Sequence, residues 1–452
     1  MIHAYELGGF RIIIDAASGS IHCVDDIAYD AIRIYEKEGA EGVAERICEQ
    51  HEKLGKSGII ELISEIEDLK RQGKLFSSDA FTGADISIRK APLKALCMNV
   101  SHLCNMECTY CFAGRGEYSG GGLMPLETGE RAIDFLVDNS GGRMNLDVDF
   151  FGGEPLLNWS VIKGIVDYAR KKERKSGKKF RFTLTTNGLL IDDDVIDFTC
   201  REMHNVVLSL DGRPDINDAS RILHGGGGSY ASVVPKIKEL VEARHGKGYY
   251  IRGTYTRVNT DFVNDILHIA DMGFTELSME PVVAKPDAAY ALSADDLPKL
   301  YEQYEMLAME MLKRKNEDRG FTFYHYKIDL TGGPCLYKRA SGCGVGVEYL
   351  AVTPEGKLYP CHQFVGEGEF LMGDVWRGIT NEKLRSKFHG CGVYSRNECK
   401  ECWARLYCSG GCSANAYHAS GSIAGVYKLG CELFKKRLEC AIMIKVAEAQ
   451  NN

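Results

Sequence analysis

The sequence contains no run of about 18 apolar residues, the length that a helix needs to cross a membrane. Its opening residues, MIHAYELGGF, have neither the basic start nor the apolar stretch of a secretory signal peptide. Positive charge is not in excess either, because 55 Lys and Arg residues face 63 Asp and Glu residues, for a net charge of −8. These absences predict a soluble, cytoplasmic protein that binds neither membranes nor nucleic acids.

Cysteine, in contrast, is abundant, with 17 residues in the chain. Because the cytoplasm is reducing and the number is odd, these thiols are not expected to form a disulfide framework. Metal ligation is the better explanation for those that cluster in sequence. The others lack ligand spacing and are expected to act as small hydrophobic residues: Cys23, Cys48, Cys97, Cys200, Cys391 and Cys440.

The chain has 452 residues, enough for two or three domains. In residues 1–90, two strand-like stretches flank the turn 17–19, and three helix-like segments follow. The last helix is expected at 58–73, and the letters KLF at 74–76 predict a short strand after it. This order predicts a winged-helix-like module, which by itself suits dimerisation or packing as well as peptide binding.

Residues 93–281 contain β-rich apolar runs that alternate with helix-length segments. The runs are LKALCMNV, NLDVDFF, KFRFTLTTN, NVVLSLD, YYIRGTYT and ELSME. Their alternation with helices predicts a parallel sheet or barrel, in which chemistry gathers at the carboxyl ends of the strands. Polar motifs follow the runs at that position: a cysteine loop, GGEP, TTNG, SLDG, TRVN and Glu280-Pro281. We therefore expect thiols, carboxylates and amides to share one mouth of the sheet.

The cysteine loop reads CNMECTYC and carries Cys104, Cys108 and Cys111. A structural zinc site needs four protein ligands, whereas an iron–sulfur cluster with one open iron needs three. No Cys or His occurs from Phe112 to Glu130, so no fourth ligand follows nearby. The loop alone leaves both kinds of site open.

The Cys-x3-Cys-x2-Cys spacing, with an aromatic residue before the last Cys and GGEP one strand later, resembles the radical S-adenosylmethionine (SAM) superfamily. The resemblance implies an α/β fold, a partial (β/α)6 barrel over 91–320, and a [4Fe–4S] cluster on the three cysteines, with SAM on the fourth iron. It implies radical abstraction of hydrogen from an unactivated carbon. The implied SAM contacts are Gly152, Gly153 and Glu154 at the ammonium, Asn187, Ser209 and Asp211 at the ribose or carboxylate, Arg221 at the carboxylate, and Tyr110 and Phe112 beside the adenine.

The C-terminal third carries cysteines whose spacing resembles the SPASM domain, here expected over 321–452. That family binds two auxiliary [4Fe–4S] clusters, which would bring the total to three. The resemblance assigns Cys399, Cys402, Cys408 and Cys431 to a distal cluster and Cys343, Cys361 and Cys412 to a proximal one. The proximal cluster either takes Cys335 as a fourth ligand or keeps an open iron for a substrate thiolate. A zinc ribbon on the cysteines at 399–412 would leave those at 343, 361 and 431 unexplained.

SPASM enzymes commonly modify ribosomally made peptides, and the N-terminal residues resemble the element with which such enzymes bind a leader peptide. The resemblance implies strand addition near residues 10–24, beside the helix at 58–73. A bound leader would raise the local concentration of a weakly held core sequence. In the C-terminal third, LAVTPEGKLYPC predicts a hairpin that presents Cys361 at the end of a strand.

Over nearly the whole chain, the stretches CNMECTYCFAG, GGPCLYKRASGCGVGVEYLAVTPEGKLYPCHQF and ECWARLYCSGGC resemble the maturases of SCIFF peptides, which are Cys-rich precursors. The resemblance implies thioether (sactionine) formation between a Cys sulfur and an α-carbon, with electrons from a ferredoxin- or flavodoxin-type donor. His362 follows Cys361 where sulfatase-maturating enzymes generally carry Asp, and is expected to act as a base or as a donor to a ligand. The alternatives are formylglycine formation from Cys or Ser, C–C crosslinking, and a non-enzymatic electron carrier.

Overall fold

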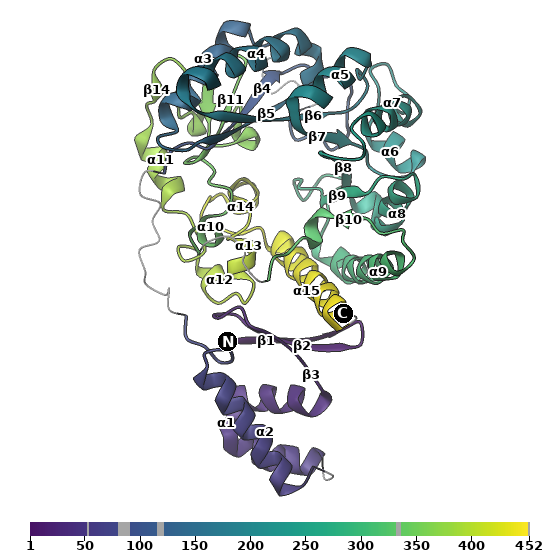
Figure 1. Cartoon of the computed structure of the whole chain (residues 1–452), viewed down its shortest axis with the longest axis vertical. Coiled ribbons are helices and arrows are strands. Elements are labelled where there is room, and N and C mark those ends of the chain that lie inside the picture. Colours follow the sequence, from purple (N-terminus) through teal and green to yellow (C-terminus); the bar gives the residue numbers. More distant parts are fainter. Residues whose placement is uncertain (52–53, 80–90, 115–121, 331–335, 451–452) are drawn as a thin grey trace.

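The computed structural model describes residues 1–51, 54–79, 91–114, 122–330 and 336–450. A small N-terminal unit lies at one end of the molecule, a large sheet with its helices lies at the other, and the C-terminal segment lies between them (Figure 1). Within these ranges, no helix is both long and apolar enough to span a bilayer.

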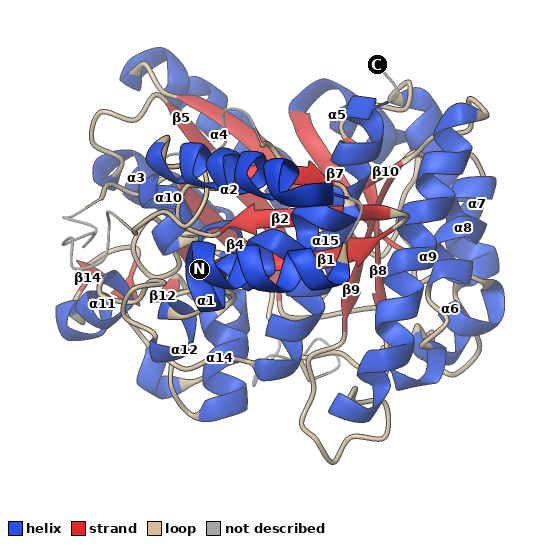
Figure 2. Cartoon of the chain, turned by 90° about the horizontal axis from the view of Figure 1, so that it is seen from below, coloured by secondary structure: helices blue, strands red, loops and turns tan. Residues whose placement is uncertain are grey.

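The N-terminal unit is an antiparallel sheet covered by helices. The strands are β1 (Ile2–Leu7), β2 (Phe10–Asp15) and β3 (Ile21–Val24), in that order across the sheet. The helices α1 (Asp26–Gln50) and α2 (Gly55–Arg71) lie on the face turned away from the rest of the chain (Figure 2). Buried Ile13, Ile32 and Ile47 form a core of this unit's own. Two helices take the place of the three predicted helix-like segments, with a break inside α1 at Gly39, where φ is 70° and ψ is −165°. The predicted strands are found with one exception.

The exception is the strand predicted at 74–76, which is wrong, because these residues form bends. The third strand of the unit is instead β1, which pairs with β2 along its whole length. Gly8 and Gly9 make this possible, since their φ angles of 60° and 83° close a tight hairpin turn. Gly73, just before this segment, and Phe76, at its end, both have positive φ. The segment is therefore not extended.

The large sheet contains every strand that the sequence predicted between residues 93 and 281. These strands are β4 (Ala95–Ser101), β5 (Asn145–Gly152), β6 (Lys179–Thr186), β7 (Met203–Ser209), β8 (Tyr249–Tyr255) and β9 (Glu276–Pro281). They lie side by side in chain order and all their pairings are parallel. The short β10 (Thr322–Phe323) continues the sheet beyond β9. The predicted α/β class with a parallel sheet is confirmed.

Helices between the strands lie along the outer side of this sheet (Figure 1). They are α3 (Leu126–Asn139), α4 (Trp159–Ser176), α5 (Asp193–Glu202), α6 (Pro214–Ser220), α7 (Tyr230–Ala243), α8 (Val263–Asp271) and α9 (Leu297–Asn316). Alternate strand residues such as Val148 and Phe150 are fully buried, while Asp149 and Phe151 between them are half-buried. This alternation leaves one face of the sheet partly open.

The C-terminal segment joins the same sheet. The predicted hairpin is confirmed as β11 (Tyr349–Val352) and β12 (Lys357–Tyr359), followed by β13 (Gly373–Asp374) and β14 (Gly378–Ile379). β11 pairs in parallel with β4, a connection that the sequence did not predict. The helices here are α10 (Leu336–Ser341), α11 (Glu382–His389), α12 (Asn397–Lys400), α13 (Arg405–Cys408), α14 (Ser413–Ser420) and α15 (Lys428–Gln450). α15 runs from this segment to the N-terminal sheet (Figure 1).

Candidate functional site

The loop that carries Cys104, Cys108 and Cys111 follows the carboxyl end of β4. Its backbone is held by the end of α6 and the residues that follow it, because Glu107 N donates to the Ile222 carbonyl at 2.8 Å and Thr109 N to the Ser220 carbonyl at 2.9 Å. The His224 ring lies 2.8 Å from the Cys104 carbonyl oxygen. The sequence did not single out His224, whose only signal was its position three residues after Arg221.

The glycine pair after β5 packs directly against this loop. Gly153 N donates to the Ser101 carbonyl and Glu154 N to the Leu103 carbonyl, both at 2.8 Å. A Cβ on Gly152 would lie 2.0 Å from the Ser101 oxygen, and one on Gly153 would lie 2.3 Å from the Leu103 oxygen. The glycines are therefore required here by the close approach of two backbones.

Glu154 is fully buried and its carboxylate already has partners. It accepts hydrogen bonds from Thr186 Oγ1 and Asn187 N, both at 2.8 Å, and from Leu156 N at 3.0 Å. Burial raises its pKa to about 7, against the opposing effect of these donors. A carboxylate has about four acceptor sites, so Glu154 has room for about one further donor. It connects the ends of β5 and β6 beside the cysteine loop.

An amide pair lies beside Cys104. Asn187 donates from Nδ2 to Asn105 Oδ1 at 2.7 Å and accepts from Leu189 N at 3.0 Å. The Nδ2 of Asn105 is buried and has no hydrogen-bond partner among the residues that the structure describes. The sequence predicted Asn187 but missed Asn105, although a polar residue inside the cysteine spacing was visible there. The pair leaves a free donor next to the first cysteine.

Tyr110, Asp211 and Arg221 form a buried group under the loop. The Tyr110 hydroxyl donates to Asp211, and Arg221 Nε lies 3.1 Å from Asp211 Oδ2. Thr254 N donates to Asp211 Oδ1 at 2.9 Å. Burial raises the pKa of Tyr110 well above its usual value, so the phenol remains a donor. Asp211 and Arg221, which were expected to contact SAM separately, are thus bound to each other, while Ser209 is half-buried at the end of β7.

The same arginine acts on the cysteine loop. Burial raises the pKa of the Cys108 thiol, and the positive charge of Arg221 opposes this rise. A metal-bound cysteine is a thiolate, so Arg221 favours the protonation state that ligation requires.

The described C-terminal cysteines that were predicted as cluster ligands lie in two groups. Burial raises the pKa of Cys408 to about 12, and the nearby thiols of Cys431, Cys399 and Cys402 raise it too. We call these four residues the distal set. Burial likewise raises the pKa of Cys361 to about 12, with nearby Cys412 and Cys343 as further causes.

We call Cys343, Cys361 and Cys412 the proximal set. Cys335, the possible fourth member, lies outside the described residues. In the part of the chain that is described, no three His, Cys, Asp or Glu side chains converge as they would on one metal ion. Cysteines on a four-iron cluster each bind a different iron, so they do not need to converge. An all-thiol set in this arrangement fits a cluster better than tetrahedral zinc.

The strand register shows that the cysteine loop and Cys361 of the proximal set lie toward opposite ends of β4. β12 runs antiparallel to β11, with Tyr359 opposite Ala351, and Tyr349 at the start of β11 lies opposite Ala95. Cys361 therefore lies near the start of β4, whereas Cys104 follows its end. A strand of 7 residues at about 3.3 Å per residue spans about 20 Å.

Aromatic rings lie between the cysteine loop and the residue that follows Cys361. The His362 ring lies 5.6 Å from the Phe112 ring and 4.9 Å from the Phe151 ring, measured between centroids. Burial lowers the pKa of His362 to about 4, and the charge of Arg252 on β8 lowers it further. The imidazole is therefore neutral at neutral pH. Phe112 lies against this ring, and its side chain is 57% exposed.

The N-terminal sheet has one covered edge. Tyr5 of β1 donates its hydroxyl to the Glu439 carbonyl of α15 at 3.0 Å, and the His3 ring stacks on Trp403 at 3.8 Å. At the other edge, β3 pairs with β2 and with no other strand of the described chain. Strand addition by a peptide is therefore geometrically open at β3.

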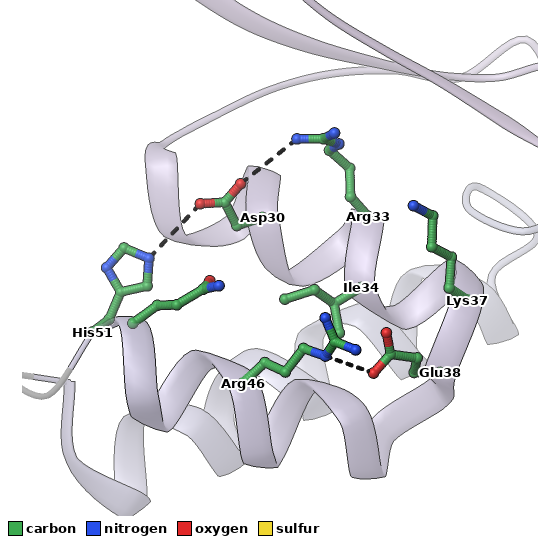
Figure 3. Close-up of a pocket in the computed structure, with 8 residues that line it drawn as sticks. Asp30, Arg33, Ile34, Lys37, Glu38, Arg46 and His51 are labelled. Atoms are coloured by element: carbon green, nitrogen blue, oxygen red, sulfur yellow. Dashed lines mark ion pairs between the residues drawn. The ribbon is translucent and has the colours of Figure 1, made fainter.

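A pocket on the N-terminal helices is a separate feature (Figure 3). Ion pairs cross it, including Arg46 with Glu38 at 2.8 Å and His51 with Asp30 at 3.8 Å. It lies along α1 and at the residue that follows it, in the N-terminal unit rather than in the large sheet. We assign it no part in the chemistry.

Residues 98–268, from β4 into α8, match the profile described as the Radical SAM superfamily. The chain is 23% identical to the radical SAM cyclopropyl synthase TigE of Paramaledivibacter caminithermalis, over 82% of this chain and 77% of that protein. It is 24% identical to a cysteine-type anaerobic sulfatase-maturating enzyme of Clostridium novyi, over 77% of this chain and 94% of that protein. The solved structure of native anSMEcpe with bound AdoMet and Cp18Cys peptide has a TM-score of 0.65 at 22% identity, and covers 80% of this chain and 99% of that one. The chain therefore has the α/β radical SAM fold.

Proposed function

We propose that the chain is a radical SAM maturase that forms a thioether (sactionine) crosslink, from a Cys sulfur to the α-carbon of another residue, in a ribosomally made, Cys-rich precursor peptide. The observation that carries the proposal is the placement of two cysteine groups toward opposite ends of β4, with His362 between them. Relatives that mature sulfatases support a polypeptide substrate. The proposed site of action is the cytoplasm, with no nucleic-acid or membrane partner.

The proposed division of the chain follows the elements. Residues 1–90 bind the leader, residues 91–320 form the radical SAM barrel, and residues 321–452 form a SPASM-type segment with two auxiliary clusters. The leader adds as a strand to the free edge of β3, next to α2. Its binding energy is realised far from the cysteine loop, which lets one active site act on a weakly held core sequence.

Cys104, Cys108 and Cys111 are the proposed ligands of a [4Fe–4S] cluster with SAM on its open iron. When bound, this group supplies a deoxyadenosyl radical that removes a hydrogen atom from a substrate carbon. The residues around the loop fit such a group, because all three ligands are thiols and the buried Nδ2 of Asn105 lacks a partner among the described residues. Asn187 orients this amide through its hydrogen bond to Asn105.

Three of the SAM contacts proposed from the sequence, Glu154, Asp211 and Arg221, have more specific roles in this proposal. Glu154 has about one acceptor site left for the SAM ammonium. The Asp211–Arg221 pair acts as one unit that positions Tyr110 under the loop and favours the Cys108 thiolate.

The proximal set is proposed to hold an auxiliary cluster with an open iron for the substrate thiolate, and the distal set to hold a closed one. His362 follows Cys361 and, being neutral, can accept the proton of an incoming thiol, although a pKa of about 4 makes it a weak base. Electrons come from a low-potential donor of the ferredoxin or flavodoxin type. If Cys335→Ala retains its iron content and activity, the open iron stands; loss of both would make Cys335 the fourth ligand.

A second candidate is formylglycine formation, which the likeness to a cysteine-type sulfatase-maturating enzyme favours. Anaerobic incubation of the reconstituted enzyme with SAM, reductant and a Cys-rich precursor separates the candidates. Thioether formation removes two hydrogen atoms from the peptide and makes one Cys resistant to alkylation. Formylglycine formation from Cys removes the sulfur atom, and from Ser it removes two hydrogens and leaves an aldehyde that a hydrazide reagent labels. A C–C crosslink removes two hydrogens, leaves every Cys open to alkylation and makes no aldehyde. An unmodified peptide with no deoxyadenosine would contradict the radical chemistry itself.

A further inference from the structure

A buried arginine, Arg396, lies in the C-terminal segment between the two cysteine sets. Its side chain is 3% exposed. The guanidinium donates to the Gly410 carbonyl, to Ser413 Oγ at 3.0 Å and to the Ile423 carbonyl at 2.8 Å. Gly410 and Ser413 flank Cys412 in sequence, so the side chain is fixed to the loop of a proximal-set cysteine.

The backbone of the same residue contacts the other set. The Arg396 carbonyl accepts a hydrogen bond from Cys399 N at 3.1 Å, and Cys399 is the first cysteine of the distal set. Burial raises the pKa of Cys399 to about 11, and the positive charge of Arg396 opposes that rise. Burial also raises the pKa of Cys412, and Arg396 opposes this as well. The side chain of Arg396 is thus bound to the loop of Cys412 and its backbone to Cys399, so this one residue joins the two sets.

In the described part of the chain, the partners of the Arg396 guanidinium are carbonyls, a hydroxyl and a sulfur, and no carboxylate lies within ion-pair distance. Its Nε is buried and makes no hydrogen bond to any described residue. A buried, uncompensated cation is costly, and the remaining contacts are neutral carbonyls, a hydroxyl and the Cys391 sulfur at 3.3 Å from Nη2. Thiolate-bound clusters on both sides would supply the missing negative charge.

We propose that Arg396 is a counter-charge shared by the two auxiliary clusters, and that it makes both of them easier to reduce. The inference rests on the proposed assignment of those clusters to the proximal and distal sets. Reduction adds one negative charge to a cluster, so a fixed cation nearby stabilises the reduced form and raises the reduction potential. Arg396 thus acts as a positioning residue through the clusters and does not touch the substrate.

The test uses the full chain with Cys104, Cys108 and Cys111 changed to Ala, which leaves only the auxiliary signals in an EPR-monitored redox titration. In this background Arg396→Gln removes the charge and Arg396→Lys keeps it. The matched control is Arg377→Gln, because the Arg377 side chain is 80% exposed in the same segment and pairs with Asp374. We expect Arg396→Gln to lower the equilibrium constant for one-electron reduction of both clusters about tenfold or more, which is about 59 mV. Arg396→Lys should retain most of the wild-type potential, and Arg377→Gln all of it.

Other outcomes would overturn the inference in distinguishable ways. Unchanged potentials in an Arg396→Gln variant with full cluster content would remove the electrostatic role. Equal losses of iron content in Arg396→Gln and Arg396→Lys would show that Arg396 only stabilises the fold of the Cys412 loop. An iron content below about eight atoms per chain in the reconstituted parent would instead contradict the assignment of two auxiliary clusters, whatever Arg396 does.

Discussion

Gly153→Ala tests the contact between the glycine pair and the cysteine loop. An added Cβ would lie 2.3 Å from the Leu103 carbonyl oxygen and 3.1 Å from Cys104 Cβ. The first contact is with backbone, which cannot rotate away as a side chain can, so the start of the cysteine loop must move by several tenths of an ångström or more. The φ of Gly153 is not in the left-handed region, so the effect comes from the contact and not from backbone strain.

The magnitude follows from the bonds that this movement breaks. Gly153 N and Glu154 N each donate to the loop at 2.8 Å. Losing two such backbone hydrogen bonds costs about 1–3 kcal/mol, and each kcal/mol lowers the melting temperature of a domain of this size by roughly 2–4 °C. Displacement of Cys104 should also weaken the cluster proposed on the cysteine loop, so we expect iron content to fall by about four atoms per chain. Deoxyadenosine release should fall about tenfold or more, since even a small misplacement of reacting groups is costly.

Gly142→Ala is the matched control, because a Cβ there would meet no atom within 4 Å and its φ is not in the left-handed region. It lies in the loop between α3 and β5, away from the cysteines. Iron content by colorimetric assay and deoxyadenosine by liquid chromatography should be unchanged in this variant. A Gly153→Ala enzyme with wild-type iron content and deoxyadenosine release within twofold of wild type would refute the reasoning.

Other perturbations probe the site and the N-terminal unit, for which leader binding is proposed. Burial raises the pKa of Glu154 from 4.5 to about 7. Between pH 4.5 and about 7 the native state therefore keeps a proton that the unfolded chain releases. The free energy of unfolding should fall by about 3 kcal/mol as the pH rises through this range. Melting temperatures at pH 5 and pH 8 should therefore differ more in wild type than in Glu154→Gln, and equal differences would contradict the assignment. Arg221→Gln leaves buried Asp211 without its counter-charge and should lower the free energy of unfolding by about 3–5 kcal/mol. Arg221→Lys should recover part of this loss. An unchanged unfolding free energy in Arg221→Gln would show that the pair does not stabilise the site. Ile60 on α2 is 68% exposed, and Ile60→Asp should weaken leader binding about tenfold by fluorescence anisotropy with an unchanged melting temperature. Unaltered affinity would place the leader elsewhere.

Much of the fold was predictable because its signals are local. The strands β4–β9 are apolar, β-rich runs separated by helix-length segments, and each ends at a polar motif. The strand β1 was missed because MIHAYEL has little apolar alternation, and its place depends on the Gly8-Gly9 turn. The pairing of β11 with β4 was not predictable either, because it joins residues 349–352 to residues 95–98 and leaves no local pattern.

The candidate site shows the same limit. The division of the C-terminal cysteines into two ligand sets came from a resemblance and stays a prediction. Spacing alone could not give it, because members of one set, such as Cys361 and Cys412, are far apart in sequence. Nor did the sequence indicate that Asp211 and Arg221 would bind each other, because burial and pairing depend on tertiary packing. The sequence also missed three polar residues that contact the site, Asn105, His224 and Arg396. Polar residues in loops follow no periodic pattern, so the sequence does not show which of them contact the site and which face solvent.

The central claim is that the chain joins a Cys sulfur to an α-carbon by radical abstraction of hydrogen at that carbon. The most direct measurement uses a Cys-rich precursor deuterated at the α-carbon of the acceptor residue, with tandem mass spectrometry of the peptide and of the deoxyadenosine. The account predicts that the peptide loses one deuterium and one thiol hydrogen, that fragmentation places the bridge at the deuterated residue, and that deuterium appears in deoxyadenosine. A modified peptide that keeps its α-deuterium, or one that has lost sulfur, would contradict it.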